Sequence, residues 1–124
     1  MKGGPFPKPV ERKKKKKYNG YKDKAERFCY YCGTPYAERH EVFGGPLRQV
    51  SIDYGFQVDL CPNCHRELQE NITERAQEEN LTWKQYYQAK YMAQLMEDGA
   101  EEKVALRLWM RLIGKNYIER LMPE

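Results

Sequence analysis

Hydrophobic and polar residues alternate strictly over residues 56–60, whose sequence is FQVDL. This period of two predicts a half-buried β-strand. Residues 35–43 are interpreted as an earlier short strand, because a Gly-Gly-Pro sequence follows it directly and ends it. The segment between the strands, residues 47–54, is expected to be a short helix or an ordered loop that a glycine stops. A helix over residues 62–71 follows, since Pro62 lacks the N–H that a first helical turn leaves unpaired.

The C-terminal part repeats its apolar residues with a helical period. Thr82 begins a sequence of capping-box form, which predicts a helix that starts there and ends near Glu97. Its apolar face recurs every four residues at Trp83, Tyr87, Tyr91 and Leu95. A second helix is expected from Ala100, with an apolar stripe of Val104, Ala105, Leu108, Trp109, Leu112 and Ile113. Gly114 is expected to break or kink this helix before a last turn through Leu121.

Together these elements predict an α+β fold in which the C-terminal helices pack against the middle of the chain. The chain has 124 residues, 32% of them charged, and a mean hydropathy of −0.96, so its core must be small. Residues 1–26 are expected to form a basic disordered tail. Residues 27–124 are expected to form a single domain, made of a module over 27–70 and a helical extension over 71–124. No membrane span or signal peptide is visible. The cysteine spacing described below favours metal binding over disulfides, which indicates a reducing compartment, and the expected location is the cytoplasm.

Basic residues are concentrated before this domain. Residues 1–17 contain eight lysines and arginines and one glutamate, whereas the whole chain has a net charge of +4. The run of Lys13, Lys14, Lys15, Lys16 and Lys17 repels itself and cannot pack into a core. One interpretation is an arm that binds phosphate backbones without sequence preference. The other is a solubilising tail.

The four cysteines form two pairs of identical spacing, Cys29-x-x-Cys32 and Cys61-x-x-Cys64. Two thiolates at this spacing can bind one metal from a single turn, and two such turns complete the tetrahedral shell that structural Zn²⁺ prefers. The spacing therefore predicts one zinc ion that brings the two pairs together. Metal binding also supplies stability that a small core lacks. Two disulfides in a secreted protein are the alternative, and the duplicated spacing favours the metal.

The two histidines of the chain, His40 and His65, both lie within the module that the cysteines define. His40 belongs to the first predicted strand, and His65 follows Cys64 at the start of the predicted helix. If the strands and this helix cross at the zinc site, the two imidazoles converge. Histidine and carboxylate side chains can hold a divalent cation, and a second histidine can take a proton from water.

The cysteine and histidine motifs of this chain resemble those of a known family. The motifs that carry the resemblance are Cys29-x-x-Cys32, then Glu38-Arg39-His40-Glu41-Val42-Phe43-Gly44-Gly45, then Leu60-Cys61-Pro62-Asn63-Cys64-His65. They are similar to the HNH or ββα-metal endonucleases with a structural four-cysteine zinc, in particular to small phage-encoded HNH-type proteins of Firmicutes. The resemblance covers about residues 27–70, and a weaker similarity is found at residues 113–117. It implies a ββα-metal module that hydrolyses phosphodiester bonds of double-stranded DNA, without a small-molecule cofactor.

The resemblance also implies roles for single residues. His40 matches the histidine that activates water, and His65 matches a ligand of the catalytic Mg²⁺ or Mn²⁺. Glu41 is the nearest carboxylate and is the expected second ligand of that ion. The expected DNA contacts are Arg39, Arg48 and the lysine run.

Two positions depart from the family pattern. Arg39 stands where a metal ligand is common, and Phe56 stands where an asparagine steadies the water-activating histidine. These departures keep a second function open. In that alternative the chain is a non-catalytic zinc-binding adaptor for nucleic acid or protein, with a degenerate HNH site.

Overall fold

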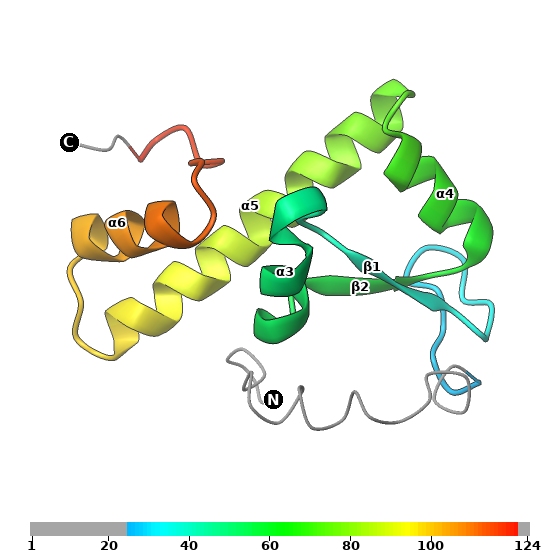
Figure 1. The fold of residues 1–124 in the computed structure, drawn as a ribbon, viewed down its shortest axis with the longest axis horizontal. Coiled ribbons are helices and arrows are strands. Elements are labelled where there is room, and N and C mark those ends of the chain that lie inside the picture. The colour runs from blue at the N-terminus through cyan, green and yellow to red at the C-terminus, as the bar shows by residue number, and fades with distance from the viewer. Residues whose placement is uncertain (1–24, 122–124) are drawn as a thin grey trace. The chain divides into compact units, whose positions relative to one another are not determined.

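The computed structural model describes residues 25–121 (Figure 1). Most of the predicted basic tail, including the lysine run, lies outside this range. The described part of the chain is α+β, with four α-helices and one two-stranded antiparallel sheet. It divides into two compact units, residues 25–80 and residues 81–121. Among the described residues, no helix is long and apolar enough to cross a membrane.

The sheet of the first unit lies within the two predicted strand segments. Strand β1 (Glu38–Glu41) pairs with β2 (Gln57–Leu60), and His40 lies opposite Val58. Strand β1 is shorter than the predicted 35–43 because Tyr36 adopts a left-handed backbone conformation, with φ of 63°. An extended strand cannot pass through that conformation.

Between the strands the chain forms a short helix, which resolves the alternative of helix or loop. A 3₁₀ turn, η1 (Gly45–Leu47), leads into α3 (Arg48–Tyr54), and Gly55 ends the helix with a φ of 76°. The fully buried Ser51 ties the helix back to the end of β1. Its Oγ accepts the N–H of Phe43 at 3.0 Å and donates to the carbonyl of Phe43 at 2.8 Å.

Helix α4 (Pro62–Glu70) begins directly after β2, as the position of Pro62 predicts, and packs against both strands (Figure 1). Cys61 caps its start, and Asn71 ends it in a left-handed conformation with φ of 55°. The buried apolar side chains of this unit come from the sheet, from the segments on either side of α3, and from α4. They include Ala37, Val42, Phe43, Phe56, Val58, Leu60 and Leu68.

Helix α5 (Glu74–Glu97) begins well before Thr82, so the predicted start is wrong, whereas its end near Glu97 is confirmed. The cap is Thr73, whose Oγ1 accepts the N–H of Ala76 at 3.0 Å. The residues between the two threonines contain no glycine or proline and are mostly strong helix formers. A helix that starts at the first cap therefore continues through the second capping sequence without interruption.

Removing each threonine tests this assignment. We expect Thr73→Ala to lower the free energy of unfolding by about 1 kcal/mol, because the N–H of Ala76 loses its acceptor. Thr82→Ala should cost less, because alanine is the better residue in a helix interior. Urea titrations followed by circular dichroism measure both. A larger cost at Thr82 than at Thr73 would contradict the assignment.

In the second unit, α6 (Glu102–Leu112) follows α5 and packs through Ala105, Leu106 and Trp109. The predicted stripe is confirmed at Ala105, Trp109 and Ile113, which are buried, but Leu106 was not part of it. Gly114, with φ of 95°, lies just beyond the end of the helix, and the N–H of Leu121 closes a last turn on Ile118.

A buried glutamine holds the final segment in place. The Nε2 of Gln88 donates to Asn116 Oδ1 at 2.8 Å, and its Oε1 accepts the N–H of Tyr117 at 2.7 Å. Trp109 Nε1 donates to the carbonyl of Lys115 at 2.8 Å. These bonds satisfy polar atoms that burial would otherwise leave without water.

Candidate metal centre and histidine cluster

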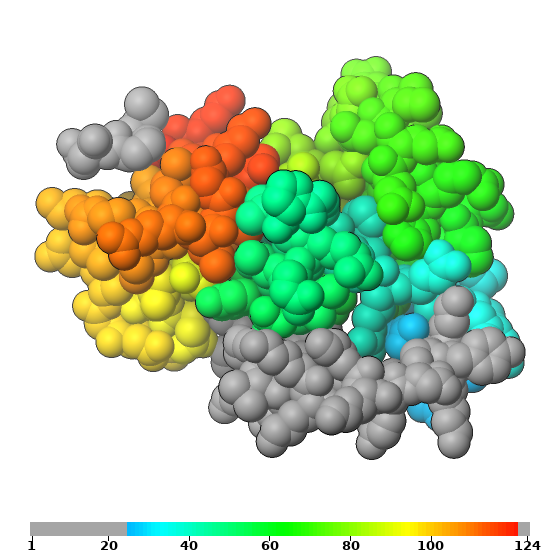
Figure 2. Space-filling model, in the orientation of Figure 1, coloured from blue at the N-terminus to red at the C-terminus, as the bar shows by residue number. Residues whose placement is uncertain are grey.

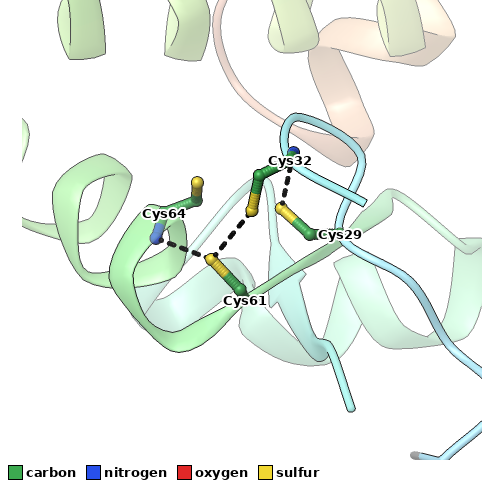
Figure 3. A group of neighbouring side chains, drawn as sticks. All are labelled: Cys29, Cys32, Cys61 and Cys64. Atoms are coloured by element: carbon green, nitrogen blue, oxygen red, sulfur yellow. Dashed lines mark hydrogen bonds between the residues drawn. The ribbon is translucent and has the colours of Figure 1, made fainter. Parts of the chain in front are cut away.

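The four cysteines meet although 28 residues separate the two pairs (Figure 3). Cys29 and Cys32 lie in the turn before β1, and Cys61 and Cys64 lie at the start of α4. Their four Sγ atoms are all within 4.8 Å of one another. Four sulfurs around a tetrahedral metal, each about 2.3 Å from it, lie about 3.8 Å apart. The cluster therefore has the size of a four-sulfur metal shell.

Backbone hydrogen bonds shape both cysteine turns in the same way. The N–H of Cys32 donates to Cys29 Sγ at 3.4 Å, and the N–H of Cys64 donates to Cys61 Sγ at 3.4 Å. The N–H of Tyr30 donates to the carbonyl of Asp59 at 2.8 Å, which fixes the first turn beside the end of β2. The second turn begins two residues after Asp59, so the two turns face each other.

All four cysteines are free thiols in the structure. The Sγ atoms of Cys32 and Cys61 are 3.4 Å apart, far beyond the disulfide bond length of about 2.05 Å. The arrangement fits a shared metal, and none of the four cysteines forms a disulfide in the structure.

The pKa values of the clustered cysteines favour the binding of a cation. Burial opposes ionisation of Cys29, but hydrogen bonds from the backbone of Cys61 and Cys32 outweigh it and lower the pKa of Cys29 to about 6. A backbone hydrogen bond from Cys64 lowers the pKa of Cys61. Burial and the sulfurs of Cys61 and Cys29 raise the pKa of Cys64. Several thiolates cannot coexist here without compensation, and a bound dication would stabilise all of them.

The two histidines converge, as the sequence predicts. The ring centroids of His40, on β1, and His65, on α4, are 5.2 Å apart in an edge-to-face arrangement. The N–H of His65 donates to the carbonyl of Cys61 at 2.8 Å, so the first turn of α4 sets the position of both His65 and the cysteine turn. The histidine pair is thus built on the same turn as half of the metal centre.

Sequence reasoning missed the carboxylate that accompanies these histidines, which is Glu38. Its Oε1 lies 2.7 Å from Nδ1 of His65. Glu38 is two residues before His40 on β1, and side chains two apart on a strand share a face. That alternation is the signal that could have identified Glu38.

Glu41, the predicted second ligand, lies on the opposite face of β1 from His40. Its Oε2 accepts a hydrogen bond from Gln57 Nε2 at 3.2 Å, and its Oε1 is 3.5 Å from Nε of Arg48. The structure therefore does not bring Glu41 and His65 together as the two ligands of one ion. Glu38 lies beside His65, where Glu41 was predicted.

The structure also places the three other positions that the sequence singled out. Arg39 Nε is 3.9 Å from Asp59 Oδ1 on the neighbouring strand, and the side chain of Arg48 is 64% exposed. Phe56, at the position where the sequence resemblance led to the expectation of an asparagine, is a fully buried core residue that packs its ring against Phe43 and Tyr54. Its side chain therefore cannot replace the amide.

Comparison with protein-family models, with curated proteins and with solved structures found no match for this chain.

Proposed function

We propose that residues 25–80 form a ββα-metal unit with a structural zinc ion, and that the protein is a metal-dependent endonuclease acting on double-stranded DNA. The observation that carries this proposal is the meeting of His40, His65 and Glu38 where β1 packs against α4. A strand pair followed by a helix, with chemically active side chains at their crossing, is the arrangement that the family resemblance implies.

The four-cysteine cluster supports zinc as the structural metal. Closed four-sulfur shells are typical of structural Zn²⁺, which leaves no open position for substrate. Cys29, Cys32, Cys61 and Cys64 would hold the ion between the turn before β1 and the start of α4. Zinc bound there would supply much of the stability of a unit with few buried apolar side chains.

His65 and Glu38 support a second ion. Donation from Nδ1 of His65 to Glu38 leaves Nε2 as the nitrogen with a free lone pair, the form in which histidine binds a metal. A carboxylate partner of this kind also orients the ring. Mg²⁺ or Mn²⁺ bound by His65 would offset the charge that develops on a phosphate during hydrolysis.

His40 supports the proton transfer. A neutral imidazole can accept a proton from the water that attacks phosphorus. The ring of His40 lies against that of His65, so a water activated by His40 would be next to a phosphate held at His65. In this assignment His40 activates water, His65 holds the ion and Glu38 orients His65.

A plasmid-nicking assay tests the proposal. Zinc-loaded protein should relax supercoiled plasmid with added Mg²⁺ or Mn²⁺ and should be inactive without an added divalent ion. We expect His40→Ala to lower the rate by about 10²- to 10⁴-fold, because proton transfer by a positioned group contributes this much. Gln49→Ala, an exposed change in α3 of the same unit, is the control and should keep the wild-type rate. Full activity of His40→Ala would sink this assignment.

The burial of His40 favours a second candidate function. His40 is only 7% exposed, which restricts the access of water, and Phe56 fills the core where the family has an amide. A non-catalytic zinc-binding adaptor for nucleic acid fits both observations. Folded, zinc-loaded protein that binds duplex DNA but nicks it with neither ion would establish the adaptor and exclude the nuclease.

A further inference from the structure

Helix α6 carries a row of exposed cations that the histidine site does not use. Lys103, Arg107 and Arg111, here called the α6 cation row, recur every fourth residue, and all three are exposed. Residues four apart on a helix are offset by only about 40°, so the three side chains lie within one arc of about 80°. The opposite side of α6 is buried through Ala105, Leu106 and Trp109. In Figure 2 the orange α6 lies at the surface.

The α6 cation row has no acidic partner among the described residues. The acidic side chains of this unit precede the row, at Glu97, Asp98, Glu101 and Glu102, or follow it, at Glu119. Glu102 pairs instead with Arg120, at 3.4 Å. Like charges four residues apart destabilise a helix, so the row works against the stability of α6 unless an anion neutralises it.

Two further cations of the same unit, Lys84 and Lys115, lie over one aromatic ring. The Nζ atoms of Lys84 and Lys115 lie 5.6 Å and 5.4 Å from the centre of the Tyr117 ring. Burial and the nearby charge of Lys115 lower the pKa of Lys84. The two ammonium groups thus repel each other, and a bound anion would relieve that repulsion. Residues 103–118 contain four basic residues and no acidic one.

We propose that the α6 cation row binds the phosphate backbone of double-stranded DNA. The row extends along a rigid helix with a rise of about 6 Å between successive cations, which suits a regular line of phosphates. Phosphate contacts of this kind bind the backbone without reading its sequence. The choice of DNA rests on the proposed function, whereas the binding itself requires no cleavage.

The surroundings of the row argue against other polyanions. A helix that lies on a membrane inserts exposed apolar side chains, but Leu106 and Trp109 of α6 are buried in the fold. Binding of unpaired bases needs exposed aromatic rings for stacking. No aromatic side chain lies on the exposed arc of α6, where Trp109 is the one aromatic residue of the helix and is fully buried.

The salt dependence of DNA binding tests this proposal in the full-length, zinc-loaded protein. The probe is a fluorescein-labelled DNA duplex without added Mg²⁺, and its affinity is measured by anisotropy over a range of NaCl concentrations. The triple variant Lys103→Gln, Arg107→Gln, Arg111→Gln should bind more weakly. Its slope of log affinity against log salt should fall by about 2.7, since each lost phosphate contact contributes about 0.9.

A second triple variant controls for net charge. Arg75→Gln, Lys90→Gln and Arg120→Gln remove the same charge, but each of these side chains already has a partner in the fold. Its slope should change by less than one contact. Equal slopes for the two triple variants would overturn the proposal, and equally tight, row-dependent binding of a matched RNA duplex would overturn the choice of DNA. Because no divalent ion is added, these outcomes are independent of whether the protein nicks plasmid.

Discussion

Replacing Cys61 with alanine is expected to abolish binding of the proposed structural zinc ion and to unfold residues 25–80. Cys61 contributes one of four clustered sulfurs and also caps α4 by accepting the N–H of Cys64. Structural zinc contributes about 10–16 kcal/mol of apparent binding free energy, which is as large as the whole folding stability of a typical small domain. Metal analysis of the purified variant and circular dichroism during heating measure the two effects. We expect no bound zinc and no cooperative transition for this unit.

Two controls separate loss of metal from general damage. Tyr30→Ala changes a neighbouring side chain in the same turn that is 66% exposed, and it should retain one zinc ion and a normal melting curve. Wild-type protein treated with a chelator should reproduce the unfolding of Cys61→Ala, and added zinc should reverse it. A Cys61→Ala protein that melts like the wild type would show that the cysteines are not what stabilises the unit.

The second large effect is expected at Glu38, and it rests on the proposed nuclease activity. Glu38→Gln removes the carboxylate that faces Nδ1 of His65. Loss of such a partner typically weakens metal binding by about 10- to 100-fold. We therefore expect the Mg²⁺ or Mn²⁺ concentration for half-maximal nicking to rise by about that factor. Zinc content should stay unchanged, because Glu38 is not part of the sulfur cluster.

Glu41→Gln is the matched control, since it removes the same charge from the same strand. Glu41 interacts with Gln57 and Arg48 on the other face of β1, so its loss should leave the metal dependence of nicking nearly unchanged. The pair of variants decides between the two carboxylates. A larger effect at Glu41 than at Glu38 would mean that the face of β1 bearing Glu41 is the one that serves the reaction.

Much of the first unit could be predicted from local signals. The alternation over residues 56–60, the proline at position 62 and the glycine at position 55 each act within a few residues, so β2, α4 and the end of α3 follow without knowledge of the whole fold. The cysteine spacing is also local within each pair. The convergence of His40 and His65 could be predicted because each histidine belongs to an element that the cysteines bring together.

The start of α5 could not be predicted from its capping sequence. Thr73 and Thr82 both have the residue type of an N-cap, and local rules do not rank them. The continuous helix-forming sequence between them decides the outcome, because propagation of a helix costs less than a second nucleation. The same limit applies to Leu106, whose burial depends on how α6 packs and not on its own periodicity.

The sequence alone predicted that the two cysteine turns are alike, that two strands precede a helix, and that the two imidazoles lie close together. Only the tertiary structure decided that Glu38, and not Glu41, accompanies His65, and that His40 is buried. The physical reason is that successive side chains of a strand point to opposite faces, and the alternation alone does not show which face contacts α4. The face of β1 that contacts His65 is the face against which α4 packs. Packing between residues far apart in the chain determines which face that is.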